Sequence, residues 1–133
     1  MKIASVFLFF SFFGWSLLAF SQEPQQLKKD FISTFTNGEM SHLKAYFNGF
    51  VNMNIPGERG FYSDTKAKWL LQDFFQKNKA KEFLLKENGY SGDNYYLIGQ
   101  YSSHTSRWNV YFLFSPKGHN FQIQQIDIEQ IKE

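Results

Sequence analysis

Residues 61–78, FYSDTKAKWLLQDFFQKN, constrain the fold of this chain more than any other stretch. Their apolar side chains recur at the spacing of one helical face, and lysine, glutamine and aspartate side chains occupy the opposite face. Ser63 or Asp64 can cap the first turn, and Asp73 lies four residues before Lys77, where an ion pair can form along the helix. The pattern predicts an amphipathic helix that needs a partner layer for one apolar stripe: Ala67, Leu70, Leu71, Phe74 and Phe75. Trp69 lies at the edge of this stripe, where it either borders the core or marks an interface.

Four segments after this helix are typical of β-strands: 81–87, 94–103, 107–115 and 121–131. The second places Tyr95, Leu97, Gly99 and Tyr101 on one face, the third is apolar on both faces, and the dipeptide Asn88-Gly89 reads as the turn after the first. In the last segment the apolar parity switches at Gln124-Gln125, which predicts a bulge or a strong bend. The four strands should form a sheet that covers the helix.

Two shorter helices and one strand are expected before the long helix. Residues 24–36 begin with a proline and are followed by Asn37-Gly38, a left-handed stop, and residues 39–47 repeat the pattern before Asn48-Gly49. Residues 50–55 alternate as a half-buried strand, Pro56-Gly57 ends it, and Glu58-Arg59-Gly60 reads as a turn.

The first 21 residues have the pattern of a targeting segment and not of the folded domain. A lysine at position 2 precedes an apolar run to Phe20, and Ala19 and Ser21 supply small residues at the positions that a signal peptidase reads. We therefore predict a signal peptide cleaved after Ser21, against the alternative of an uncleaved membrane anchor of similar length. Residues 22–133 would then form a single periplasmic or secreted domain.

The composition excludes several classes of protein. The chain has no cysteine, so disulfides, thiolate metal sites and cysteine nucleophiles are absent. Its formal net charge is only +2, which predicts no nucleic-acid partner and no membrane partner after cleavage. No spacing typical of a metal site or of a nucleophilic serine occurs, and no metal or cofactor is predicted.

The order of the expected elements, helix, helix, strand, short strand, long helix and four strands, resembles the nuclear transport factor 2-like superfamily, a cystatin-type cone. Local features agree with this resemblance: the 37–39 junction with Leu43, Tyr46 and Phe47 behind it, Tyr62 before the helix, Phe74-Phe75 near its end, and Tyr96, Ile98 and Gly99 in a strand. They are also similar to a family of short exported bacterial proteins known only as a domain of unknown function. The resemblance implies an α+β fold in which a curved antiparallel sheet wraps the long helix and leaves a pocket at the open end of the cone.

The same resemblance frames two classes of function, because this fold includes enzymes as well as binding and dimerisation modules. The aromatic content of 20% favours a non-catalytic module that binds a small apolar or mixed-polarity ligand or forms a homodimer through the sheet face. The candidate pocket residues are Tyr95, Tyr101, Trp108, Phe112 and Phe74.

The alternative is a small cofactor-independent isomerase, dehydratase or cyclase. Enzymes with this cone place an acid-base residue in the pocket, and the candidates here are Asp127, between two isoleucines of the last strand, and His104, in a serine-rich loop. His42 and His119 are expected to face solvent. Asp127 should point away from the isoleucines, which makes it either an outer residue or a carboxylate inside the cone.

Overall fold

The structure is a computed structural model that describes residues 23–132. The predicted signal peptide lies outside the described residues. Two α-helices, a 3-10 turn and six strands follow in this order: α2 (Gln25–Asn37), η1 (Lys44–Tyr46), β1 (Phe50–Ile55), β2 (Glu58–Ser63), α3 (Asp64–Lys77), β3 (Glu82–Ser91), β4 (Asn94–Ser102), β5 (Arg107–Lys117) and β6 (Asn120–Gln130).

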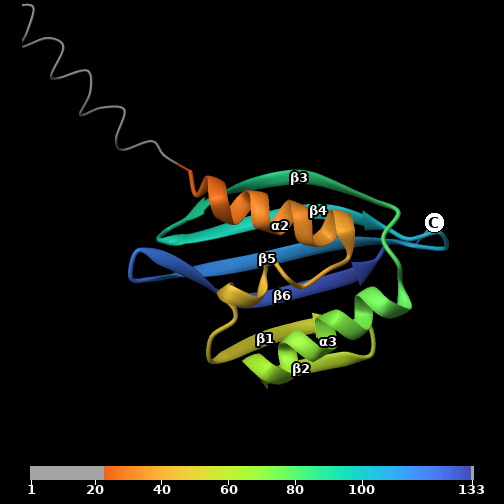
Figure 1. Cartoon of the computed structure of the whole chain (residues 1–133), viewed down its shortest axis with the longest axis horizontal. Helices are drawn as coiled ribbons and strands as arrows, with labels where there is room; N and C mark the ends of the chain where they lie inside the picture. The colour runs from red at the N-terminus through yellow and green to blue at the C-terminus, as the bar shows by residue number, and fades with distance from the viewer. Residues whose placement is uncertain (1–22, 133) are drawn as a thin grey trace, which may run out of the picture.

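The strands form one curved sheet in the order β2-β1-β6-β5-β4-β3. All neighbouring pairs are antiparallel except β1 and β6, which run parallel. Helices α2 and α3 lie over the same face of the sheet, with α2 against β3 and α3 against the β1–β2 hairpin (Figure 1). The α+β architecture predicted from the sequence is confirmed: a curved sheet is wrapped around its helices, and both α-helices of residues 23–132 lie on its inner face.

Helix α3 forms as its periodicity predicts. The Ser63 hydroxyl accepts a hydrogen bond from the Lys66 amide at 3.3 Å, and the Asp73 carboxylate lies 2.8 Å from the Lys77 ammonium. The buried side chains of α3 are those of the predicted stripe, Ala67, Leu70, Leu71, Phe74 and Phe75. Trp69 is outside the stripe and 57% exposed.

The two N-terminal segments expected to be helices differ in the length of helix that they form. Helix α2 stops where Gly38 adopts a left-handed φ of 66° and its amide donates to the Thr34 carbonyl, as the Asn37-Gly38 pair predicts. The second expected helix, 39–47, is shorter than its pattern suggests, because only Lys44–Tyr46 winds, as a 3-10 turn. Nine residues between two glycine stops form too few hydrogen bonds to offset the cost of starting an α-helix.

Two expected turns belong to strands instead. Gly89 has no positive φ and lies opposite Tyr96, where an added Cβ would be 3.3 Å from the phenol oxygen. This glycine is therefore needed to make room for a cross-strand ring, and β3 continues to a turn at Gly92, whose φ is 62°. Likewise Glu58 begins β2 directly after the Pro56-Gly57 turn.

The bulge predicted in the last strand is present. Ile126 pairs with Phe112 and Ile123 pairs with Phe114, so the residues between them outnumber their partners and Gln124 is the extra residue. The bulge restores the isoleucines on both sides of it to the inner face of the sheet, where they join the core.

Candidate functional site

The five aromatic residues predicted to line a pocket all belong to the hydrophobic core, and three of them are in mutual contact. Tyr95, Tyr101, Trp108, Phe112 and Phe74 are all at most 5% exposed. The ring of Phe74 is 5.7 Å from that of Tyr101 and 5.2 Å from that of Trp108, and Tyr101 and Trp108 are 5.8 Å apart. These rings fill the space between α3 and the sheet with one another.

The two core tyrosines have partners for their hydroxyl groups. The Tyr95 hydroxyl donates to Asn88 Oδ1 at 2.6 Å, and the Tyr101 hydroxyl donates to the Asn78 carbonyl just after α3. Burial raises the pKa of Tyr95 and of Tyr101 from 10 to about 12, with a smaller contribution from the Glu23 charge at Tyr95. Both phenols are therefore neutral donors at ordinary pH, and both join elements of the fold.

The acid-base candidates lie in two separate places. Asp127 is on the outer face of the sheet, where it accepts a hydrogen bond from Gln125 at 2.8 Å and borders a shallow cleft of about 250 Å³ with Tyr111 and Ile98. Burial, and then the Asp127 charge, raise the pKa of Tyr111. His104 is exposed in the β4–β5 loop, beside a polar cleft of about 490 Å³ at the strand ends. The structure does not bring the two candidates together in either cleft.

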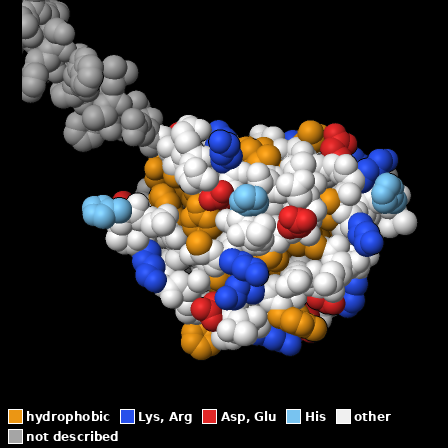
Figure 2. All heavy atoms as spheres, in the orientation of Figure 1, with side chains coloured by type: hydrophobic (Ala, Val, Ile, Leu, Met, Phe, Trp, Pro, Cys, Tyr) orange, Lys and Arg blue, Asp and Glu red, His pale blue; other side chains and the backbone are white. Residues whose placement is uncertain are grey.

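A cleft of about 590 Å³ lies between the C-terminal ends of α2 and α3, and we call it the interhelical cleft. Met40 and Phe75, both nearly buried, contribute apolar surface to it, and the rest of its lining is mostly amide and charged side chains. Figure 2 shows hydrophobic side chains at the surface between the two helices, bordered by polar and charged ones. The lining residues are Asn37, Gly38, Glu39, Met40, Ser41, Lys44, Gln72, Phe75, Gln76, Lys79 and Ala80.

A tether that the sequence does not reveal holds one wall of this cleft. The Tyr46 hydroxyl donates to Asp30 Oδ2 at 2.6 Å, and the ring packs edge-on against Phe114 at 6.0 Å. His42 Nδ1 lies 3.9 Å from Asp30 Oδ1. Burial and the hydrogen bond to Asp30 raise the pKa of Tyr46. The segment that supplies Met40 to the cleft is thereby fastened to α2, across sixteen residues of sequence with no motif that would indicate the pair.

Residues 23–132 hold neither a cluster of metal ligands nor a helix suited to a membrane. Within this part of the chain no three histidine or acidic side chains gather as metal ligands would. None of the helices described there has the length and apolar character needed to cross a bilayer.

Comparisons with known proteins identify relatives of this fold. The model of a family described as a domain of unknown function (DUF4783) matches residues 29–129. A crystal structure of a DUF4783 protein from Bacteroides ovatus is similar with a TM-score of 0.71 and 26% identity, covering 77% of this chain and 93% of that one. One from Bacteroides uniformis has a TM-score of 0.73 and 20% identity over 84% of this chain and all of the other.

More distant likeness extends to the wider fold. An NTF2-like protein of unknown function from Silicibacter pomeroyi has a TM-score of 0.57 and 14% identity, covering 80% of this chain and 92% of that one. No match is found among curated proteins. The resemblance to the nuclear transport factor 2-like fold, expected from the order of elements, is confirmed.

Proposed function

We propose that this chain, which belongs to the DUF4783 family, is a non-catalytic module that binds a small ligand of mixed polarity in the interhelical cleft. The composition of the cleft carries the proposal: Met40 and Phe75 offer apolar surface, while amide groups and the Lys44 and Lys79 side chains surround it. A volume of about 590 Å³ suits a small molecule, since ligand pockets measure roughly 300–1,000 Å³. We also propose that the module acts in the periplasm or outside the cell, after cleavage behind Ser21.

The absence of catalysis is proposed because the cleft is poor in acid-base groups. Glu39 is the one carboxylate among its lining residues, and no histidine is among them. An isomerase, dehydratase or cyclase needs a base within hydrogen-bond reach of its substrate. Asp127 and His104, the bases available to that alternative, border other clefts.

Native mass spectrometry of the protein purified from an exporting host tests the ligand proposal. We expect an added mass that is retained under gentle conditions and lost when Gln76, an exposed residue of the lining, is replaced by Trp. Thr65→Trp, at an exposed position in the first turn of the same helix and outside the lining, is the control and should keep the mass. Absence of any added mass, or equal retention by both variants, would refute binding in this cleft.

A second candidate function, homodimerisation, is favoured by the outer face of the sheet. Two cross-strand pairs of partly exposed residues, Ile98 with Tyr111 and Tyr96 with Leu113, lie there on β4 and β5. Six strands about 4.8 Å apart, each about nine residues of 3.3 Å, give a face of roughly 700 Å². A stable interface takes about 800 Å² from each partner, so a second copy of this chain fits the available area.

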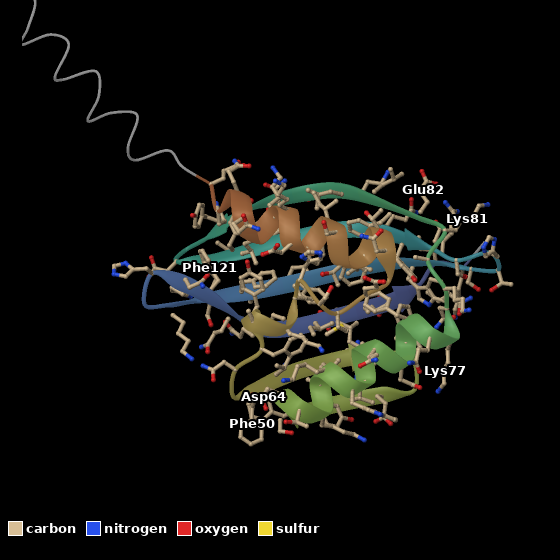
Figure 3. The ribbon with its side chains drawn as sticks, viewed as in Figure 1. Phe50, Asp64, Lys77, Lys81, Glu82 and Phe121 are labelled. Carbon is tan, nitrogen blue, oxygen red and sulfur yellow. The ribbon has the colours of Figure 1, made fainter. Side chains whose placement is uncertain are left out.

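The margin of the same face is also apolar. Phe50 and Phe61 are 60% and 69% exposed and their rings stack at 5.2 Å, and Figure 3 shows Phe50 projecting from the molecule near Asp64. Sedimentation equilibrium should report a dimer that Ile98→Glu converts to a monomer, because two buried carboxylates would then oppose each other. Gln25→Glu, at an exposed position of α2 on the opposite side of the sheet, is the control and should leave the dimer intact. A monomer at all concentrations in the unsubstituted protein would refute this candidate.

A further inference from the structure

A second cleft, separate from the one proposed above, lies between α3 and the β1–β2 turn. We call it the Trp69 cleft, and its volume is about 300 Å³. Three nearly buried side chains, Ile55, Leu70 and Phe74, contribute to it. The remaining lining residues are Pro56, Gly57, Glu58, Trp69, Asp73, Lys77 and Asn78.

Trp69 is unusual for a helix residue that takes no part in the core. Its side chain is 57% exposed, although most large aromatic side chains of the described residues are buried. The ammonium of Lys66, one turn earlier, lies 4.8 Å from the centre of its ring. This cation–π contact holds the ring from one side, and more than half of the Trp69 surface stays exposed to a ligand. A fixed aromatic face loses little conformational entropy when a ligand stacks on it.

The polar groups of the cleft provide both donors and acceptors. Asp73 is held by one ammonium, that of Lys77, at 2.8 Å, and a carboxylate has room for further donors. Asn78 donates through Nδ2 to the Phe74 carbonyl at 3.1 Å, which leaves its amide oxygen as an acceptor. The Lys77 ammonium carries three N–H donors.

The charges of the cleft decide between classes of ligand. An organic cation on the exposed part of the indole would be repelled by the ammonium groups of Lys66 and Lys77, and Lys77 already pairs with Asp73. An anion would meet the carboxylates of Glu58 and Asp73. The ligand that fits is therefore neutral, has a flat apolar face for the indole, and carries hydroxyl groups that both donate and accept.

We propose that the Trp69 cleft binds a neutral saccharide. One C–H face of a pyranose ring would stack on the exposed part of the indole, whose π-cloud is negative and suits the weakly positive C–H groups. The ring hydroxyls would donate to Asp73 and to the Asn78 amide oxygen and accept from Lys77. The inference is independent of the interhelical cleft, because the two linings share no residue.

The proposal is tested by titrating saccharides into the full chain, whose tryptophan residues carry ¹⁵N. Cellobiose, lactose and chitobiose are the probes, and each indole N–H gives one signal, assigned from the spectrum of Trp69→Phe. We expect the Trp69 signal to shift with saturation for at least one probe, while that of the buried Trp108 stays in place. Tetramethylammonium chloride at the same concentrations should leave the Trp69 signal unchanged.

A matched pair of variants locates the contact. Trp69→Ala should weaken saccharide binding by at least about tenfold, as measured from the shifts of backbone amide signals, since stacking contributes on the order of 1.4 kcal/mol. Phe61→Ala removes an aromatic residue that is 69% exposed and lies outside this cleft, and it should leave the affinity unchanged. Circular dichroism checks that both variants fold, and Trp69→Phe, with a smaller ring, should show an intermediate loss.

Several outcomes would overturn the inference. If none of the three disaccharides shifts the Trp69 signal, or if tetramethylammonium does so in their place, the cleft is not a saccharide site. Equal weakening by Trp69→Ala and Phe61→Ala would also contradict it. Loss of binding by Gln76→Trp would place the saccharide in the interhelical cleft instead, which distinguishes a failure here from a failure of the function proposed above.

Discussion

Replacement of Gly99 by alanine should destabilise the fold chiefly through a clash with the Phe83 ring. Gly99 lies in β4 on the inner face, and a methyl group added there would be 2.5 Å from Cε1 of Phe83, nearer still to Cζ, and 3.0 Å from the Leu84 carbonyl oxygen. Carbon atoms pack best at about 3.5–4.0 Å, so the Phe83 ring has to move. This ring packs against Phe31 at 5.6 Å and Phe35 at 5.2 Å, and it cannot turn away without losing those contacts.

The expected cost lies between overpacking and loss of the ring. Overpacking costs about 1–3 kcal/mol, and removal of a core phenylalanine costs about 3–5 kcal/mol, so we expect Gly99→Ala to lower the free energy of unfolding by about 2–4 kcal/mol. Urea denaturation of Gly99→Ala, Phe83→Ala and the double variant measures the coupling. Once Phe83 is alanine, the added methyl has space, and Gly99→Ala should then cost less than about 1 kcal/mol. Additive losses in the double variant would refute the proposed clash.

Three other predictions concern the tyrosines and the N-terminus. Tyr46→Phe should lower the free energy of unfolding by about 1–2 kcal/mol, because the half-buried Asp30 carboxylate loses a donor. Tyr96→Phe removes a surface hydrogen bond to Glu87 and should cost less than about 0.5 kcal/mol. Equal losses in urea denaturation would contradict the tether between Tyr46 and Asp30. Burial raises the pKa of Tyr101 from 10 to about 12, so the stabilising contribution of this phenol is complete below pH 10 and is lost as the pH rises from 10 to 12. Tyr101→Phe should therefore flatten the fall in the free energy of unfolding over that pH range. An unchanged slope would count against this account of the tyrosine. The intact mass of the exported protein should match a chain that begins at Gln22, and a mass that includes residues 1–21 would refute cleavage.

The fold could be predicted from the sequence where buried side chains recur at the regular spacing of a helix or a strand. The stripe of α3 and the parity switch at Gln124 both follow from which side chains face the core, and this information lies within a few residues of each position. Gly89 was misleading because its lack of a side chain serves Tyr96 on the neighbouring strand, a partner that local spacing does not identify. The bond between Tyr46 and Asp30 likewise joins residues whose pairing local spacing does not identify.

The candidate site was harder to predict because parity gives the face of a strand and not the space in front of it. Tyr101 and Trp108 face inward as their alternation indicates, but whether an inward face lines a pocket or fills it depends on sheet curvature and on the reach of α3. The interhelical and Trp69 clefts are formed by helix ends and turns, whose positions only the packed chain determines. For Trp69, at the edge of the helical stripe, the sequence allowed either a border of the core or an interface, and the side chain is 57% exposed.

The filled interior bears directly on where a ligand can bind. A ligand inside the cone would have to displace rings such as Tyr101, which contacts Phe74 and Trp108 and donates to the Asn78 carbonyl. Displacing a buried aromatic side chain costs about 3–5 kcal/mol, which weakens the apparent affinity by about a hundredfold to several thousandfold. The interhelical and Trp69 clefts require no such displacement, because their volumes are already open at the surface. A ligand of modest affinity is therefore expected at the ends and flanks of the helices, with the aromatic interior serving to hold those walls in place.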